Sequence, residues 1–411
     1  MTAPRKTLHP DILKLGLVSF LTDLSSEMIF SVFAVFFTTV AGASAALLGL
    51  IEGLADFSAS SLNYLAGRLS DRSGKRKLFT LAGYGFSTAA KTLLLVSTSI
   101  AGLALFRVIE RLGKGFRGPP RDAWLAALAD PATRGYSFGV HKALDKAGAV
   151  LGPLLAYALL SWVGETEAGY RTLFWVALVP ALLALAVLTR IEDRTGLRRE
   201  PESAVHNWQQ LSPGFKRFLL PAGIFALAYY SLGFLLLRAH QTGFDVKQVV
   251  LLYALFNITC VITAPLAGHL GDWIGRSYIV MFGYALYAGI NVAMIFIDSA
   301  AAIVTLFAVY GVFYAVEESQ SKAFIADLEA ERRASAAGLY NCVTGAIYLP
   351  ASLLAGGLWV LAPLWAFALA ALLSLLALLC FVMLNPAASL PAASIGADAA
   401  ASSPAAPGVR R

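Results

Sequence analysis

A cluster of charged residues lies inside an otherwise apolar stretch of the chain, between Arg107 and Asp122. Apolar runs precede and follow it, so these charges would lie within, or at the mouth of, a membrane-spanning segment. A charge at the centre of a bilayer costs roughly 2.5–3.5 kcal/mol even on a lenient scale, so the cluster must face protein or water. We therefore expect a charged transport cavity; the alternative is a basic loop that binds lipid headgroups. Helical spacing puts Arg107, Arg111, Lys114 and Arg121 on one face.

Paired carboxylates occur in the first two apolar segments, one helical turn apart in each. Two carboxylates close together in a low dielectric cannot both ionise cheaply, so one of them keeps a proton. That is the chemistry a proton-coupled carrier needs; the alternative is that these acids only neutralise the bases of the segment near residues 100–127. Both can hold, because exchange of partners on protonation is itself a coupling mechanism. The proposed proton-coupling residues are Asp23, Glu27, Glu52, Asp56 and Asp145.

A third group of charges lies at i, i+3 and i+4 spacing between residues 142 and 146, and its two lysines share a helix face. The second half of the chain has far fewer membrane charges. The adjacent acids Glu317 and Glu318 occupy the position that corresponds to the basic cluster, and only one of them can point directly inward. The candidate substrate-binding residues are Arg107, Arg111, Lys114, Lys142, Lys146, Tyr229, Asn257, Glu317 and Glu318.

Composition places the chain in a membrane. Of its 411 residues, 58% are hydrophobic and only 14% are charged, whereas a soluble domain has about 25% charged residues. The net charge of +7 arises from bases in short loops between apolar runs, which is typical of topology control rather than nucleic-acid binding. No phosphate-binding loop, nucleophile elbow or zinc motif occurs, so we expect neither an enzyme, a cofactor nor a metal site.

Twelve apolar segments of about twenty residues are each long enough to span a bilayer. The sequence thus predicts an all-α membrane protein with two bundles of six helices. Lys and Arg are concentrated in alternate loops, which predicts cytoplasmic N and C termini. The segments are 15–39, 45–67, 78–97, 100–127, 138–162, 171–189, 218–237, 247–270, 277–297, 300–325, 335–357 and 362–384. The expected parts are an N-terminal bundle (1–190), a cytoplasmic linker (191–216), a C-terminal bundle (217–385) and a disordered cytoplasmic tail (386–411).

The two halves repeat a motif. Residues 67–75 and 268–276 both read G-x-L-x-D-x-x-G-[KR], after the second and the eighth segment. The glycines allow a tight turn, and the aspartate can pair with the base or with backbone donors. Two prolines at 119 and 120 are expected to break or bend the fourth segment. The residues to which we assign gating are Gly67, Asp71, Arg72, Gly74, Arg117, Arg121, Asp122, Gly148, Gly152, Pro153, Gly268, Asp272, Gly275 and Arg276.

These features resemble the major facilitator superfamily over residues of about 12–385, with the two loops matching its signature and its copy. Gly148-x-x-x-Gly152-Pro153 resembles a glycine–proline motif that is common in the proton-coupled exporters of that family. Arg111 or Arg107 corresponds to an arginine often found in helix four, and the run RxGKGxRxxPRDA resembles a poorly characterised prokaryotic subgroup. The resemblance implies alternating access around a site at the membrane midplane.

The sequence therefore predicts a secondary transporter of the cell (inner, cytoplasmic) membrane that exports a small anionic or zwitterionic molecule in exchange for protons. Its partners would be that molecule, protons and the lipid bilayer, with no nucleic acid, and it would act as a monomer. The alternatives are a proton symporter that imports an organic anion, and a transport-inactive sensor on the same scaffold.

Overall fold

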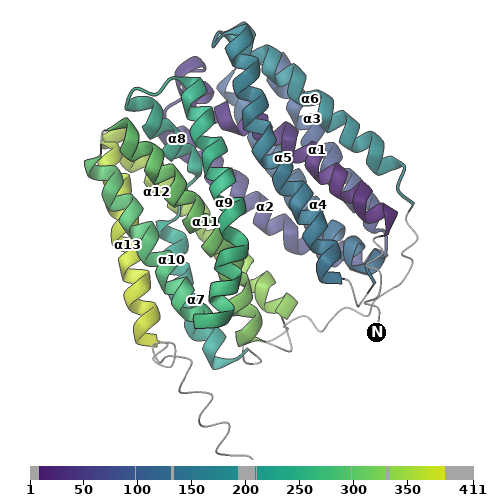
Figure 1. The fold of residues 1–411 in the computed structure, drawn as a ribbon, viewed down its shortest axis with the longest axis vertical. Coiled ribbons are helices and arrows are strands. Elements are labelled where there is room, and N and C mark those ends of the chain that lie inside the picture. Colours follow the sequence, from purple (N-terminus) through teal and green to yellow (C-terminus); the bar gives the residue numbers. More distant parts are fainter. Residues whose placement is uncertain are drawn as a thin grey trace, which may run out of the picture.

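The computed structural model describes residues 9–97, 99–130, 134–192, 209, 211–297, 299–329 and 333–384. All the regular structure in this part of the chain is helical. Helices from the first half of the chain group on one side of the molecule and those from the second half on the other (Figure 1). Most of the predicted linker and all of the predicted tail lie outside the described residues.

The first half contains six spans, the first of which continues from α1 into a π-helical turn, Phe36–Val40. Charged and polar residues that the lipid would not tolerate turn inward, and exposed leucines and valines cover the outer faces. The helices are α1 (Pro10–Val35), α2 (Ala45–Ser73), α3 (Arg76–Val96), α4 (Ile100–Leu128), α5 (Arg134–Val163) and α6 (Glu167–Thr189).

The second half also contains six spans, because α7 and α8 together cross once. The chain leaves the helical conformation at Tyr229, and Ser231 begins α8 as its N-cap, accepting from the backbone N–H of Gly233 at 3.2 Å. The helices are α7 (Pro213–Ala228), α8 (Leu232–Gln241), α9 (Val246–Ile274), α10 (Arg276–Phe296), α11 (Ala300–Leu328), α12 (Arg333–Leu361) and α13 (Pro363–Leu384).

The prediction of twelve spans is confirmed. Ten spans of the described chain are long and apolar enough to cross a membrane. The 21 residues of α3 and the 29 residues of the charged helix α4 complete the set. The predicted break in the fourth segment is wrong, since α4 continues through Pro119 and Pro120. Gly67 of α2 leaves room for the proline ring, because a Cβ there would lie 3.2 Å from Pro119 Cβ.

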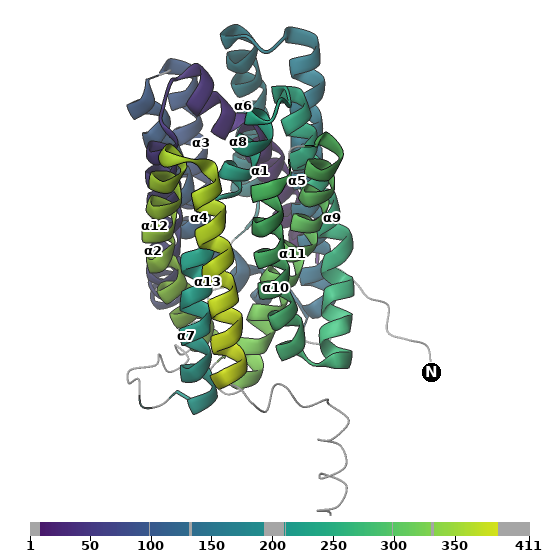
Figure 2. The ribbon, with the colours of Figure 1, turned by 90° about the vertical axis from the view of Figure 1, so that its left-hand side faces the viewer.

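The halves meet along two long helix pairs, α2 with α12 and α5 with α9 (Figure 2). Glycines bring the first pair into backbone contact. A Cβ on Gly49 would lie 2.3 Å from the carbonyl oxygen of Ser352, and one on Gly345 would lie 2.2 Å from Ser60 Cβ. Small residues at such crossings maximise van der Waals contact, which is the main force between helices in lipid.

The linker end of the molecule is where α2, α4, α6, α9 and α11 end, and the far end is where α3, α5, α8, α10 and α12 end. At the far end α1 packs on α8 and α9 of the other half. There Glu165 accepts from the backbone N–H of Val246 at 3.3 Å and lies 3.8 Å from the Lys247 ammonium.

Candidate functional site

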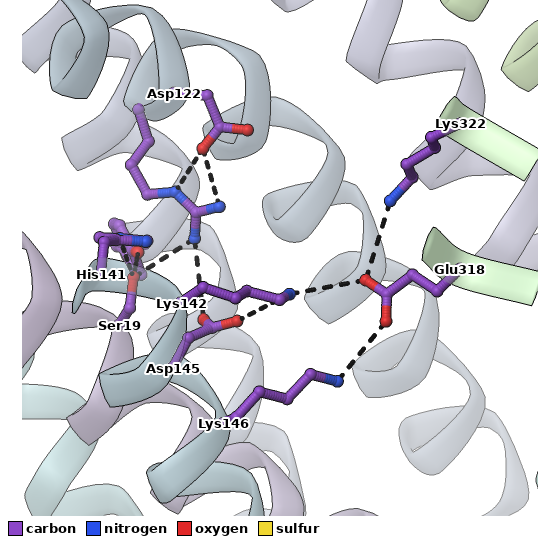
Figure 3. Close-up of polar contacts among 10 residues, drawn as sticks. Ser19, Asp122, His141, Lys142, Asp145, Lys146, Glu318 and Lys322 are labelled. Carbon is purple, nitrogen blue, oxygen red and sulfur yellow. Dashed lines mark hydrogen bonds and ion pairs between the residues drawn. The ribbon is translucent and has the colours of Figure 1, made fainter. Parts of the chain in front are cut away.

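One carboxylate links the two halves on the linker-end side of the interface. Glu318 on α11 lies among three ammonium groups: Lys142 at 3.5 Å and Lys146 at 3.6 Å, both on α5, and Lys322 at 3.7 Å on its own helix (Figure 3). All three distances exceed the 2.7–2.9 Å of a tight charge-assisted hydrogen bond. The cluster thus carries excess positive charge and is held loosely.

A second acid shares the first of these lysines. Asp145 lies 3.2 Å from Lys142 and 4.0 Å from Arg121 Nη1. Arg121 donates to Asp122 at 3.0 and 2.9 Å and to Ser19 on α1 at 3.3 Å (Figure 3). The structure therefore brings Arg121 and Asp122, predicted as gating residues, into one network with the α5 charges.

Asp23 on α1 belongs to the same region. Its carboxyl group neighbours that of Asp145 closely enough to share a hydrogen bond. Among the described residues it has no base within 4.0 Å; Glu27 also lacks an ion pair there, but it accepts a hydrogen bond from Tyr253. Two adjacent carboxyls with bases beside only one of them form an arrangement suited to holding a proton.

A tighter ion pair lies nearer the far end. Arg107 donates from Nε and Nη2 to the two oxygens of Glu52, at 2.6 Å each, and both side chains are almost fully buried. Ser231, at the break between α7 and α8, also donates to Glu52 at 2.9 Å. Phe30 packs 4.3 Å from the Arg107 guanidinium carbon, and Glu110 lies 3.6 Å from Nη1. This arginine is thus committed to protein partners on α2 and α4.

The next bases along the same helix face are less committed. Arg111 lies 3.6 Å from Asp56, and both side chains are partly exposed, at 22% and 28%. Its Nε has no hydrogen bond among the described residues. Lys114 is exposed, one turn further on. Nη1 of Arg107 also lacks a hydrogen bond among the described residues, but the Arg107 side chain is buried; Arg111, the more exposed of the two arginines that the sequence left open, is the one that another group can reach.

The aromatic side of the interface comes from the second half. The Tyr253 hydroxyl donates to the Glu27 carboxylate across the halves. The Asn257 amide donates to the Tyr253 carbonyl at 3.1 Å, and Tyr229 packs on Tyr348 with ring centroids 5.6 Å apart. The structure thus brings Glu27 to the interface, whereas the contacts of Tyr229 and of the Asn257 amide lie within the second half.

Two predicted residues face elsewhere. Glu317 lines a small cavity inside the second half, between α10 and α11. Arg117 is buried between α3 and α4, where it donates to Ser87 at 2.6 Å and lies 4.7 Å from the Tyr84 ring centre. A gating role for Arg117 would thus act within the first half rather than between the halves.

The repeated motif is mostly helical. Gly67 and Gly268 lie inside α2 and α9, so the expectation of a turn at these two glycines is wrong; the turns occur at Gly74 and Gly275, with φ of +67° and +100°. Only glycine adopts these angles without strain. The side chain of Asp71 lies outside the described part, and Arg72 is exposed at the end of α2.

In the second copy the motif ties three helices together. Arg276 at the start of α10 lies 2.9 Å from Asp272 on α9 and 2.6 Å from Asp327 on α11. It also donates to the Ala323 carbonyl at 3.1 Å. The pairing of aspartate and base that the motif predicted is therefore present at the linker end.

The glycine–proline motif brings α5 against α1. A Cβ on Gly148 would lie 2.3 Å from the Phe20 carbonyl oxygen, and one on Gly152 would lie 2.8 Å from that of Leu24. Pro153 lies within α5 without ending it. This contact fixes the carboxyls of α1 next to the lysines of α5.

Sequence reasoning missed two polar partners, Ser231 and Tyr253, each of which donates to a carboxylate of the other half. Lys91, expected from the sequence to be a pairing or a snorkelling base, is buried in the first half and donates to Ser25 and Ser26 at 2.6 and 3.1 Å. The serine could have been found as an N-cap within an apolar segment. The tyrosine carries no comparable signal, since most membrane tyrosines pack.

Comparisons with known proteins agree with this architecture. The model of the Major Facilitator Superfamily matches residues 15–238 and 219–408. An uncharacterised MFS-type transporter of Methanocaldococcus jannaschii is 34% identical over 378 residues, covering 90% of this chain and 94% of the relative. A POT family transporter in complex with 5-aminolevulinic acid superimposes with a TM-score of 0.77 at 11% identity, covering 94% of this chain and 99% of that chain.

A second solved structure has the same fold. It is a bacterial homologue of the human lysosomal transporter Spinster, inward-facing and occupied, with a TM-score of 0.72 at 16% identity, covering 92% of this chain and 96% of that chain. At such identities the likeness concerns the fold alone. The family match and the archaeal relative go further, and they confirm the resemblance that the motifs predicted. The chain belongs to the Major Facilitator Superfamily and is a multi-pass membrane transporter.

Proposed function

We propose that this transporter exports a small anionic or zwitterionic molecule in exchange for protons, by alternating access between its two halves. The observation that carries the proposal is the position of Glu318, a single carboxylate among three ammonium groups at the interface. A carboxylate or phosphate of the substrate has the charge and the hydrogen-bonding geometry to replace Glu318 at the two α5 lysines.

The loose geometry supports this exchange. Contacts of 3.5 and 3.6 Å from Glu318 to Lys142 and Lys146 leave each ammonium with donors to spare, since an ammonium carries three. A bound anion would take Lys142 and Lys146 away from the other half and so loosen one link across the interface. Arg111, with its unused Nε, lies on the adjacent helix as a further donor.

Protons enter through Asp23 in this proposal. A proton held between Asp23 and Asp145 leaves one negative charge on the pair; its loss leaves two, which draw Lys142 from Glu318 toward Asp145, 3.2 Å away. Proton release and substrate binding would thus act on the same lysine. The four remaining coupling candidates already have partners: Arg107 for Glu52, Arg111 for Asp56, Tyr253 for Glu27, and Lys142 for Asp145.

Export is favoured over import by the Gly148–Pro153 motif, which resembles that of proton-coupled exporters and sets α5 against α1. Alternating access requires the cross-half links at Glu318, Glu27 and Glu52 to break and reform. These links lie at different depths, with Glu318 toward the linker end and Glu52 toward the far end. The links at the linker end could therefore break while those at the far end stay formed, and the reverse, as alternating access requires.

The test begins with the substrate. Comparison of metabolites between deletion and overexpression strains identifies the exported compound, and its flux is then measured in proteoliposomes with and without a pH gradient. Gradient-driven flux is expected in the wild type and should be lost in Lys142→Gln and Asp23→Asn, while Asp23→Asn retains exchange between substrate pools. The matched control is Lys14→Gln, because within the described part of the chain Lys14 pairs with Asp11 alone, near the linker end. Flux that ignores the pH gradient would reject proton coupling.

A further inference from the structure

Glu317 lies in an unusual place for an acid. Its side chain lines a cavity of about 10 Å³ between α10 and α11, together with Tyr284 and Ser321. The remaining wall is apolar and includes Val280, Phe313 and Val316. This volume is about the minimum that holds one water molecule. The next residue, Glu318, faces the interface instead, so the two adjacent acids serve different environments.

No cation from another helix faces Glu317 in the described part of the chain. Ser321 and Tyr340 lie within hydrogen-bonding reach of its carboxyl group, and the base that acts on it is Lys322, on its own helix. Lys322 lies 3.7 Å from Glu318. Apart from Glu318, whose charge opposes a charge on Glu317, the other titratable groups around it are phenols: Tyr229 on α7, Tyr284 on α10, Tyr310 and Tyr314 on α11, and Tyr340 and Tyr348 on α12.

A carboxylate in such surroundings is costly, because it has lost water without gaining a base. A protonated carboxyl is much less costly there, since it can donate a hydrogen bond to one of the two neighbouring hydroxyls and accept a hydrogen bond from the other. The arrangement therefore matches the neutral acid, while Glu318 has the three ammonium partners that a carboxylate needs.

We propose that Glu317 is a second proton-binding site, within the C-terminal half and apart from the substrate contacts. One carboxylate oxygen takes up the proton, forming an O–H that donates to Ser321 or Tyr340, and releases it again as a free proton. This inference rests on the proposed proton-coupled function, which it extends from α1 and α5 to α11.

The position links this proton to the interface. Glu317 and Glu318 are consecutive on α11, and Lys322 on the same helix acts on both. A charge appearing on Glu317 would compete for Lys322 and repel Glu318, and so change the link from Glu318 to Lys142 and Lys146. Each half would then hold its own proton beside the same cross-half cluster.

Infrared difference spectroscopy between two pH values, on the full chain in lipid vesicles, tests the assignment without a substrate. The wild type is expected to show the carbonyl band of a protonated carboxyl, with a component that Glu317→Gln removes. Glu318→Gln is the matched control, one residue away on the same helix, and should leave that component in place. Ser321→Ala should shift the component without removing it, because the carboxyl loses a hydrogen-bond partner.

An unchanged band in a folded Glu317→Gln variant would overturn the proposal, as would loss of the same component in Glu318→Gln. Should Glu317→Gln not fold, Ser321→Ala and Glu317→Asp carry the test: a shifted component in both supports the site, and no shift in either overturns it. The band does not depend on flux. If the infrared band is assigned to Glu317 but the substrate flux does not depend on the pH gradient, the proton-binding site is supported and only the proton-coupled function is rejected.

Discussion

The guanidinium of Arg107 and the carboxylate of Glu52 form a two-point ion pair, with both N···O distances at 2.6 Å and both side chains at most 5% exposed. The same carboxylate accepts from Ser231 of the other half. This buried, well-aligned ion pair lies beside the break between α7 and α8. Through the hydrogen bond from Ser231 it is part of the contact between the two halves.

Removal of one partner of this pair should be strongly destabilising. Arg107→Ala would leave the Glu52 charge buried without a base, which typically costs about 3–5 kcal/mol. The double variant Arg107→Ala with Glu52→Gln should recover a large part of that loss. Thermal unfolding in detergent measures both. The control is Arg171→Ala, whose 2.9 Å pair with Glu167 is exposed and should contribute at most about 1 kcal/mol. Equal losses at Arg107 and Arg171 would contradict this account.

Loss of the Ser231 hydroxyl should act on conformation more than on folding. Ser231→Ala removes a hydrogen bond to a charged group, of about 1.5–3 kcal/mol, between the halves. The far end should therefore separate more often. Spin labels at Val40 and Leu361, in a background without native cysteines, report the distance across that end. Ser299→Ala is the control, because Ser299 caps α11 at the same end without touching the other half. Identical distance distributions in both variants would contradict a link at Ser231.

The fold could be read from the sequence almost completely, because bilayer thickness fixes the length of a span and backbone hydrogen bonding forces it to be helical. The boundaries differ from the predicted ones by a few residues, as at α5, which starts at Arg134 rather than 138. The break at Tyr229 was not predicted, because the only local signal is Ser231 as an N-cap within an apolar run. The contact of Ser231 with Glu52 adds a tertiary contribution that the sequence does not reveal.

The sequence predicted which charged residues form the candidate site, but not which acid pairs with which base. Helical spacing placed the bases of α4 on one face, yet it could not say that Arg107 would take Glu52 and that Arg111 would take Asp56. Arg117 lies within the first half for a similar reason: its rotation on α4 turns it toward Ser87 on α3. The sequence could say only that one of the adjacent acids Glu317 and Glu318 points toward the interface. The packing of α10 against α11 places the Glu317 side chain between these two helices.

The close crossing of α1 and α5 predicts an asymmetry between two glycines of one helix. Gly148→Ala places a Cβ 2.3 Å from the Phe20 carbonyl, so the helices must move apart; overpacking of this kind costs about 1–3 kcal/mol. Gly139→Ala meets no atom within 4 Å and should be neutral or slightly stabilising. Thermal unfolding and, once the substrate is known, the flux in proteoliposomes compare the two. Equal behaviour would show that the crossing tolerates a methyl group.

The orientation in the membrane remains a prediction from the distribution of Lys and Arg. Reporter fusions near residues 42, 98 and 360 should read outside, and those near 73, 203 and 390 should read inside. An exported signal at 203 would contradict both the orientation and the division into two halves of six spans. The far end, where the halves are joined through Glu52 and Ser231, would be the outer side in this orientation.

Arg111 offers the sharpest test of the anion site. It lies 3.6 Å from Asp56, and their partial exposure puts the cost of Arg111→Ala between that of an exposed and a buried pair, at about 1–3 kcal/mol. A purely structural pair predicts that Arg111→Lys is mild and that Asp56→Asn restores the stability of Arg111→Ala. An arginine that grips the substrate in two-point fashion predicts that Arg111→Lys folds normally but loses most binding, because lysine presents a point charge rather than a planar fork.

The measurement is thermal unfolding of these variants with and without the exported compound. Because Nε of Arg111 lacks a hydrogen bond and Asp56 is not within hydrogen-bonding distance of it, we expect the second outcome. In Arg111→Lys the stabilisation by the compound should be largely lost, whereas Lys14→Gln should keep it. Asp56→Asn alone should keep it too, since the guanidinium that grips the substrate is still present. Restored folding in the Arg111→Ala, Asp56→Asn double variant, with stabilisation by the compound intact, would remove Arg111 from the substrate site and leave it as a structural partner of Asp56.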